Sequence, residues 1–192
     1  MQYAVSILLG LGLAASCGFR VFVPLLVTNV ASMLGDVKLA GGFEWMGSWV
    51  AFAIFATATL VEIAAYYIPW LDNVLDTIST PLAIIAGSVL TSSFIVDMDP
   101  MLKWTLAIIV GGGSAGVIKA GAVVIRLGSS TLTGGIGNSL LATFENFISI
   151  LFSVLSFIVP VVTGVLAIVI TVFSFNKILR RRKTVRAQNE TT

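Results

Sequence analysis

Four charged side chains occur inside long apolar stretches of the sequence. Arg20, Glu62, Lys119 and Glu145 each fall near the middle of such a stretch. At the centre of a membrane helix a charged residue costs roughly 2.5 to 3.5 kcal/mol on translocon scales, and such residues mark ion pairs or polar pathways. Two cations and two anions offset that cost only by meeting. We therefore predict that these four side chains pair inside a membrane protein.

The sequence leaves both the pairing and its purpose open. Arg20 can pair with Glu62 and Lys119 with Glu145, or the pairs can cross between the two halves of the chain. Buried ion pairs can have a purely structural role, in which they fix the register of helices. They can also line a polar pathway for an ion or solute.

Two polar stripes favour a pathway. Tyr66 and Asp76 follow Glu62 at helical spacing, with Pro69 and Asn73 between them, and Ser149 and Ser156 similarly follow Glu145. Polar stripes on membrane helices face the interior of the bundle or a wet cavity. We therefore predict that an ion or ligand pathway is lined by Arg20, Glu62, Asp72, Asp76, Lys119, Asn138 and Glu145.

Several reaction chemistries lack the residues they need. The sequence has no histidine and a single cysteine, Cys17, so an internal disulfide and a multi-cysteine metal cluster are excluded. It contains no reactive serine elbow, and the glycine run 111–113 is not followed by the Lys-Ser/Thr of a phosphate loop. We expect no enzymatic activity, no metal and no cofactor.

The composition places the chain in a membrane. Apolar residues make up 57% of the 192 residues and charged residues 10%, against about 25% charged in an ordinary soluble domain. The apolar runs are too long and too many for the core of a soluble domain of this length. The lipid bilayer is thus the predicted partner.

The cations concentrate at the carboxyl end. Six of the eleven Lys and Arg residues lie in the last sixteen residues. Basic clusters directly after a membrane helix stay on the cytoplasmic side, so we predict a cytoplasmic tail at 180–192 and no nucleic-acid binding. Beyond Lys183 we expect this tail to be disordered.

The apolar runs predict an all-α bundle of six transmembrane helices. The first run, 3–34, has 32 residues and exceeds the about 20 needed to span a bilayer, so it is tilted, broken at Pro24 or partly re-entrant. The other predicted spans are 45–70, 78–96, 102–127, 138–158 and 161–175, with linkers at 71–77 and 129–138.

The two halves of the chain resemble each other. The pairs that correspond are Gly12 with Gly111, Arg20 with Lys119, Glu62 with Glu145, and Pro81 with Pro160. Three spans in each half make this an inverted repeat of the kind found in secondary transporters, with halves at 1–100 and 101–179. An even number of spans then puts both termini in the cytoplasm.

Small residues recur at one-turn intervals in the first and fourth spans. Gly10 and Gly18 lie on one such face, and Gly112 and Gly116 on another. Such faces let two helices approach closely, so we predict that these two spans cross there. The run 111–113 either serves this packing or unwinds and exposes backbone to an ion.

The order of these residues resembles a known family. The relevant residues are the run Gly18-Phe19-Arg20-Val21-Phe22-Val23-Pro24, then Glu62, Pro69, Asp72, Asn73, Asp76 and Pro81, and finally Asn138, Glu145, Asn146 and Pro160. The pattern resembles the bacterial membrane-protein family called domain of unknown function 4126, which has a basic residue in place of Tyr67 and an acidic one in place of Asn146. The resemblance implies a bacterial inner membrane and adds no substrate.

These observations predict a small transporter or channel-like protein for an ion or small polar solute. Glu62 and Glu145 would bind a proton or cation, and Arg20 and Lys119 would be their partners or an anion site. The alternative is a structural or lipid-interacting membrane protein whose charges only lock its helices. A homo-oligomer is compatible with either.

Overall fold

The protein is all-α, as predicted. The structure, a computed structural model, describes the backbone of 2–133 and 136–189 and the side chains of 4–68, 71, 74–133 and 137–179. Its helices are α1 (Gln2–Phe19), α2 (Phe22–Met33), the short 3-10 helix η1 (Glu44–Gly47), α3 (Trp49–Ala65), α4 (Pro69–Phe94), α5 (Pro100–Leu106), the π-helical η2 (Ala107–Gly112), α6 (Gly113–Thr133), α7 (Ile136–Ile158) and α8 (Pro160–Asn189).

The surface and the interior are inverted relative to a soluble protein. Large apolar side chains such as Trp49, Leu140 and Phe173 are 75%, 76% and 66% exposed, while Arg20 and Asn29 are fully buried. Apolar exposure of this extent suits lipid. Among the described residues, four segments are long and apolar enough to cross a membrane, namely Val74–Phe94, Pro100–Thr133, Gly137–Ile158 and Pro160–Leu179. The chain is therefore a helical membrane protein.

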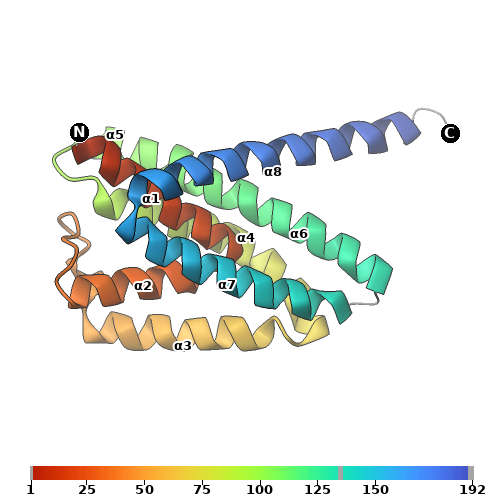
Figure 1. Ribbon diagram of the computed structural model, residues 1–192, viewed down its shortest axis with the longest axis horizontal. Helices are drawn as coiled ribbons and strands as arrows, with labels where there is room; N and C mark the ends of the chain where they lie inside the picture. The colour runs from red at the N-terminus through yellow and green to blue at the C-terminus, as the bar shows by residue number, and fades with distance from the viewer. Residues whose placement is uncertain (1, 134–135, 190–192) are drawn as a thin grey trace.

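The first apolar run is a hairpin. After α1, the chain reverses at Arg20 and Val21, and α2 runs back alongside the bundle (Figure 1). The run is therefore broken into two helices, which was one of the three alternatives. The break is not at Pro24, which is the third residue of α2. A proline is tolerated there because the amides of the first helical turn have no partner within the helix.

The boundary between the second and third spans differs from the prediction. α3 ends at Ala65 and α4 begins at Pro69, so the predicted linker 71–77 is helical. Ile68 is extended, as a residue before proline prefers, and Pro69 opens α4, where its missing amide costs nothing. Glu62 and Asp76 therefore lie on different helices, and the predicted single stripe is wrong.

The second half is more continuous than predicted. α5, η2 and α6 follow one another without a break from Pro100 to Thr133, so the glycine run 111–113 is helical and 129–133 is not a loop. The predicted division at Pro160 is confirmed, since α7 ends at Ile158. α8 continues to Asn189, where disorder was predicted beyond Lys183.

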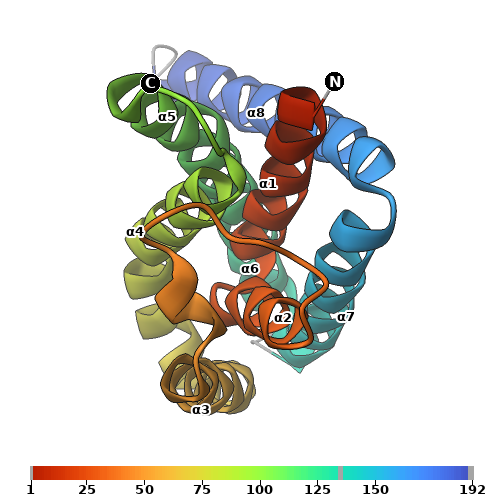
Figure 2. The same cartoon turned by 90° about the vertical axis from the view of Figure 1, so that its left-hand side faces the viewer.

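The helix directions bear on topology. The start of α1, the α2–α3 connection and the α7–α8 junction lie at one end of the bundle, and α8 extends toward the other (Figures 1 and 2). Because α1 and α2 form a hairpin, the chain returns to the end of the bundle at which α1 begins. The prediction had counted this first apolar run as a single span. The predicted placement of both termini in the cytoplasm stays a prediction.

α1 lies at the centre of the bundle and packs closely against α4 (Figure 2). A Cβ on Gly18 would lie 2.6 Å from the Ile118 Cβ, so α1 crosses α6 there, as predicted. Gly10 instead meets α4, where its Cβ would lie 2.9 Å from the Thr91 Cα. Gly112 and Gly116 also face α4, at Ile84. Thus α4 occupies part of the crossing that was predicted for α1 and α6 alone.

Replacing Gly18 with alanine is expected to lower the free energy of unfolding by about 1–3 kcal/mol, because the added methyl group overlaps Ile118 and the carbonyl oxygen of Ala115. Gly113→Ala is the matched control, since a Cβ there has open space. Melting in detergent measures both variants. Equal melting temperatures would contradict the close α1–α6 contact.

Candidate functional site

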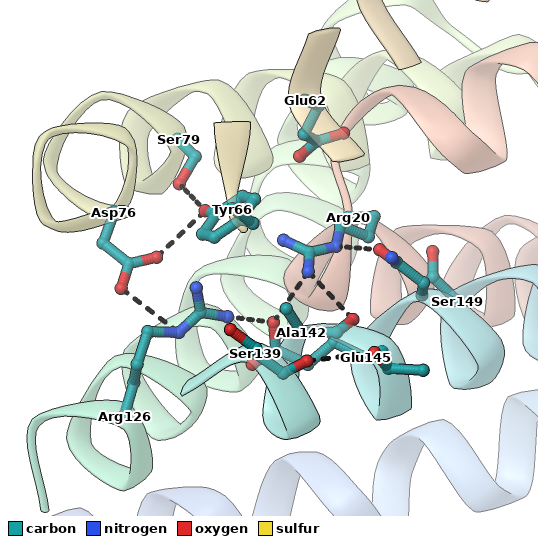
Figure 3. Close-up of polar contacts among 12 residues, drawn as sticks. Arg20, Glu62, Tyr66, Asp76, Ser79, Arg126, Ser139, Ala142, Glu145 and Ser149 are labelled. Atoms are coloured by element: carbon teal, nitrogen blue, oxygen red, sulfur yellow. Dashed lines mark hydrogen bonds and ion pairs between the residues drawn. The ribbon is translucent and has the colours of Figure 1, made fainter. Parts of the chain in front are cut away.

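Six charged side chains gather inside the bundle and form what we call the charge network. Its members are Arg20 at the hairpin turn, Glu62 on α3, Asp76 on α4, Lys119 and Arg126 on α6, and Glu145 on α7. Figure 3 labels all of these except Lys119. The three cations are at most 2% exposed and the three carboxylates at most 7%. Among these residues the formal charges balance. The predicted meeting of opposite charges is thus present in the structure.

Glu145 is held by two arginines. Arg126 Nη2 donates a hydrogen bond to Glu145 Oε2, and Arg20 Nη2 lies 3.5 Å from the same oxygen. Arg20 also donates from Nε to Asn146 Oδ1 and from Nη2 to the Ala142 carbonyl oxygen at 3.0 Å. Of the predicted pairings, the structure contains the crossed pair between Arg20 and Glu145.

Asp76 is the partner of Lys119. The Lys119 Nζ lies 3.1 Å from Asp76 Oδ1, and Arg126 Nε lies 3.5 Å from Asp76 Oδ2. Arg126 therefore bridges the carboxylates of α4 and α7. The predicted ion pair between Lys119 and Glu145 does not form among the described residues, because Asp76 takes that place.

Tyr66 lies at the centre of the charge network. Its hydroxyl donates to Asp76 Oδ1 at 2.9 Å and accepts from Lys119 Nζ at 2.7 Å. The Cζ atoms of Arg20 and Arg126 lie 3.8 and 4.3 Å from the centroid of its ring. Tyr66 is 1% exposed, so these cation–π contacts are shielded from water. Cation–π contacts are stronger when they are desolvated.

Glu62 is held by backbone amides, and the predicted ion pair with Arg20 does not form among the described residues. Its two carboxylate oxygens accept hydrogen bonds from the amides of Val21 and Phe22, at 2.9 and 3.0 Å. These amides open α2, where the helix dipole favours negative charge. A residue from α3 thus caps the hairpin, which explains why α2 starts before Pro24.

Asn138 is a predicted site residue that lies outside this cluster. Asn138 Nδ2 donates to Ser130 Oγ at 2.7 Å, near the α6–α7 turn. Ser149 is buried and donates to the Ser16 carbonyl oxygen, so the α7 stripe does face the interior. Asp72 belongs to α4, but its side chain lies outside the described residues.

Sequence reasoning missed Arg126 and the central position of Tyr66. Arg126 follows Lys119 by seven residues, which is two helical turns, so both cations share one face of α6. That spacing was the available indication. Asn146 was noted only as a departure from a family pattern, yet its amide oxygen accepts from Arg20.

Three guanidinium nitrogens have no hydrogen-bond partner among the described residues. They are Arg20 Nη1, Arg126 Nη1 and Arg126 Nε, the last of which has only the 3.5 Å ion pair to Asp76. Buried N–H groups are nearly always satisfied, so unmatched donors at this depth point to a polar ligand or to water. The charge network therefore has more donors than acceptors.

Comparisons with known proteins place the chain in a family. Neither the curated proteins nor the solved structures contain a match to it. The family model described as domain of unknown function (DUF4126) matches residues 7–180, which confirms the resemblance seen in the sequence. With the match covering nearly all of the chain, the protein belongs to the DUF4126 family.

Proposed function

We propose that this protein is a small transporter or channel-like protein for an ion or small polar solute, and that the charge network is its binding element. The observation that carries the proposal is the set of buried ionised groups with unmatched guanidinium donors around Tyr66. Ionisable residues inside a membrane protein line substrate and ion pathways more often than they serve any other role.

Energetics support a role beyond packing. Apolar residues of similar volume often stabilise a protein as well as a buried ion pair does, or better. Here three cations and three carboxylates are retained within one bundle. Because their formal charges balance, binding one further ion or proton changes the electrostatic energy of the whole network.

The hairpin also supports the proposal. Arg20 and the amino end of α2 lie in the bundle interior and contact α3 and α7. Interrupted helices whose ends point at the bilayer midplane form the substrate sites of many transporters. The proposed inverted repeat fits this arrangement, since its corresponding residues Arg20, Lys119, Glu62 and Glu145 all belong to the charge network. The basic end of α8 would lie in the cytoplasm.

The competing candidate is a structural membrane protein. In its favour, each described carboxylate of the charge network has at least two donors, as a helix lock would require. The two candidates differ in whether the charge network passes a solute.

Flux measurements separate them. Proteoliposomes containing the protein and entrapped pH- or halide-sensitive dyes are expected to show flux above protein-free vesicles. Glu62→Gln and Glu145→Gln are expected to reduce it roughly tenfold to a hundredfold, since a hydrogen bond to a charged group contributes about 1.5–3 kcal/mol. Lys38→Ala, on an exposed loop, is the control. Wild-type rates equal to empty vesicles would refute the proposal.

A further inference from the structure

The amino end of α2 is built to hold a carboxylate inside the bundle. α2 has 12 residues and begins beside Arg20, and its first free amides, those of Val21 and Phe22, both point at the Glu62 carboxylate. Two converging amides and the positive end of the helix dipole bind a carboxylate irrespective of the molecule that carries it. Glu62 is 3% exposed, so this contact is shielded from solvent.

Glu62 is held differently from the other two carboxylates of the charge network. Asp76 and Glu145 each have two cationic partners within 3.5 Å. Glu62 has no ion pair within the described part of the chain, and its hydrogen bonds come from backbone amides alone. It is therefore the carboxylate whose displacement breaks the fewest charge contacts.

Arg20 supplies an independent indication of a ligand. Its Nε and Nη2 are engaged by α7, whereas Nη1 is fully buried and has no hydrogen-bond partner. Figure 3 shows this nitrogen on the side of the guanidinium that faces Tyr66 and Glu62. The two helix-end amides are thus bonded to Glu62, and the guanidinium N–H that faces this carboxylate is an unmatched donor beyond ion-pair distance of it.

We infer that the amino end of α2 is the binding site for the carboxylate group of a small anion, and that Glu62 is the internal occupant that this anion replaces. The inference rests on the proposed function, because it names the substrate class of the same charge network. The ligand carries one negative charge, and Glu62 takes up a proton as it leaves the amides, so the formal charges of the network still balance. Its carboxylate accepts from the amides of Val21 and Phe22, and Arg20 Nη1 is a further donor for a ligand oxygen that lies nearer to it than the Glu62 carboxylate does.

Removing Glu62 provides the test. In the purified Glu62→Ala variant, acetate is expected to raise the melting temperature saturably, by about 3–6 °C at tenfold the half-saturating concentration. The wild-type protein is expected to show a smaller shift, because Glu62 occupies the site. If Glu62→Ala does not fold, Glu62→Gln, which keeps one acceptor oxygen, should show a smaller saturable shift.

Asp99→Ala is the matched control. Asp99 also accepts from two helix-end amides, those of Met101 and Leu102, but it is exposed and caps the short helix α5. Acetate should not stabilise this variant. A shift in Asp99→Ala equal to that of the Glu62 variant, an equal shift with potassium chloride, or no shift in either Glu62 variant would overturn the inference.

The test is independent of transport. Stabilisation by acetate without flux in proteoliposomes would refute the proposed function and leave the anion site in place. Flux without stabilisation by acetate would refute the site and leave transport in place.

Discussion

Replacing Arg126 with alanine is expected to lower the free energy of unfolding by about 3–5 kcal/mol. Arg126 is the cation that contacts both Asp76 and Glu145, and it also lies over the ring of Tyr66. Its removal leaves two buried carboxylates with one cation fewer each. Unfolding in mixed micelles, followed by circular dichroism, measures the loss.

A double-mutant cycle isolates the contact with Glu145. If the two side chains meet, Arg126→Ala combined with Glu145→Ala should lose less than the sum of the single variants, by about 0.5–3 kcal/mol. Lys119→Ala with Glu145→Ala should show weaker coupling, because Lys119 contacts Asp76 instead. Lys38→Ala, on an exposed loop, should change stability by less than about 0.5 kcal/mol. Strict additivity of the Arg126 and Glu145 effects would contradict the geometry.

The sequence predicted the features that depend on composition and local pattern. Long apolar runs gave the all-α membrane class, Pro160 gave the division between α7 and α8, and the cost of charge in lipid identified four members of the charge network. Each of these follows from the nature of a residue and its immediate neighbours. The six-span count does not, and it is not confirmed, since only four segments of the described chain are long and apolar enough.

The hairpin could not be predicted from its own residues. A turn usually carries polar or glycine residues that satisfy its backbone. Here the amides of Val21 and Phe22 are satisfied by Glu62, about forty residues further along the chain. The apolar run therefore shows no turn pattern, and Pro24 was the only visible candidate for a break.

The pairing of the charges could not be predicted from the sequence, for a related reason. Arg126 falls near the end of a predicted span, where a long basic side chain is expected to reach the membrane interface. In the structure it turns inward instead, because Asp76, Tyr66 and Glu145 meet it there from three other segments. Such convergence is a property of the tertiary fold alone.

Tyr66 variants are expected to separate the two functions of this side chain in the charge network. Tyr66→Phe keeps the ring but removes the hydroxyl, so Lys119 and Asp76 each lose one hydrogen bond while their 3.1 Å ion pair persists. The expected loss of unfolding free energy is about 1.5–3 kcal/mol, as for hydrogen bonds to charged groups. Tyr66→Leu also removes the ring beneath Arg20 and Arg126, where each desolvated cation–π contact contributes about 2 kcal/mol, so its loss should reach about 5.5–7 kcal/mol.

Tyr67→Phe is the matched control for the hydroxyl. Tyr67 is the next residue along the chain, is 43% exposed, and shares an exposed hydrogen bond with the Thr143 hydroxyl. Its replacement should cost less than about 0.5 kcal/mol. Unfolding of the three variants by chaotrope or detergent measures the loss of unfolding free energy. We expect this loss to increase in the order Tyr67→Phe, Tyr66→Phe, Tyr66→Leu. If Tyr66→Leu were no worse than Tyr66→Phe, the arginines would gain nothing from the ring, and the charge network would be held by its ion pairs alone.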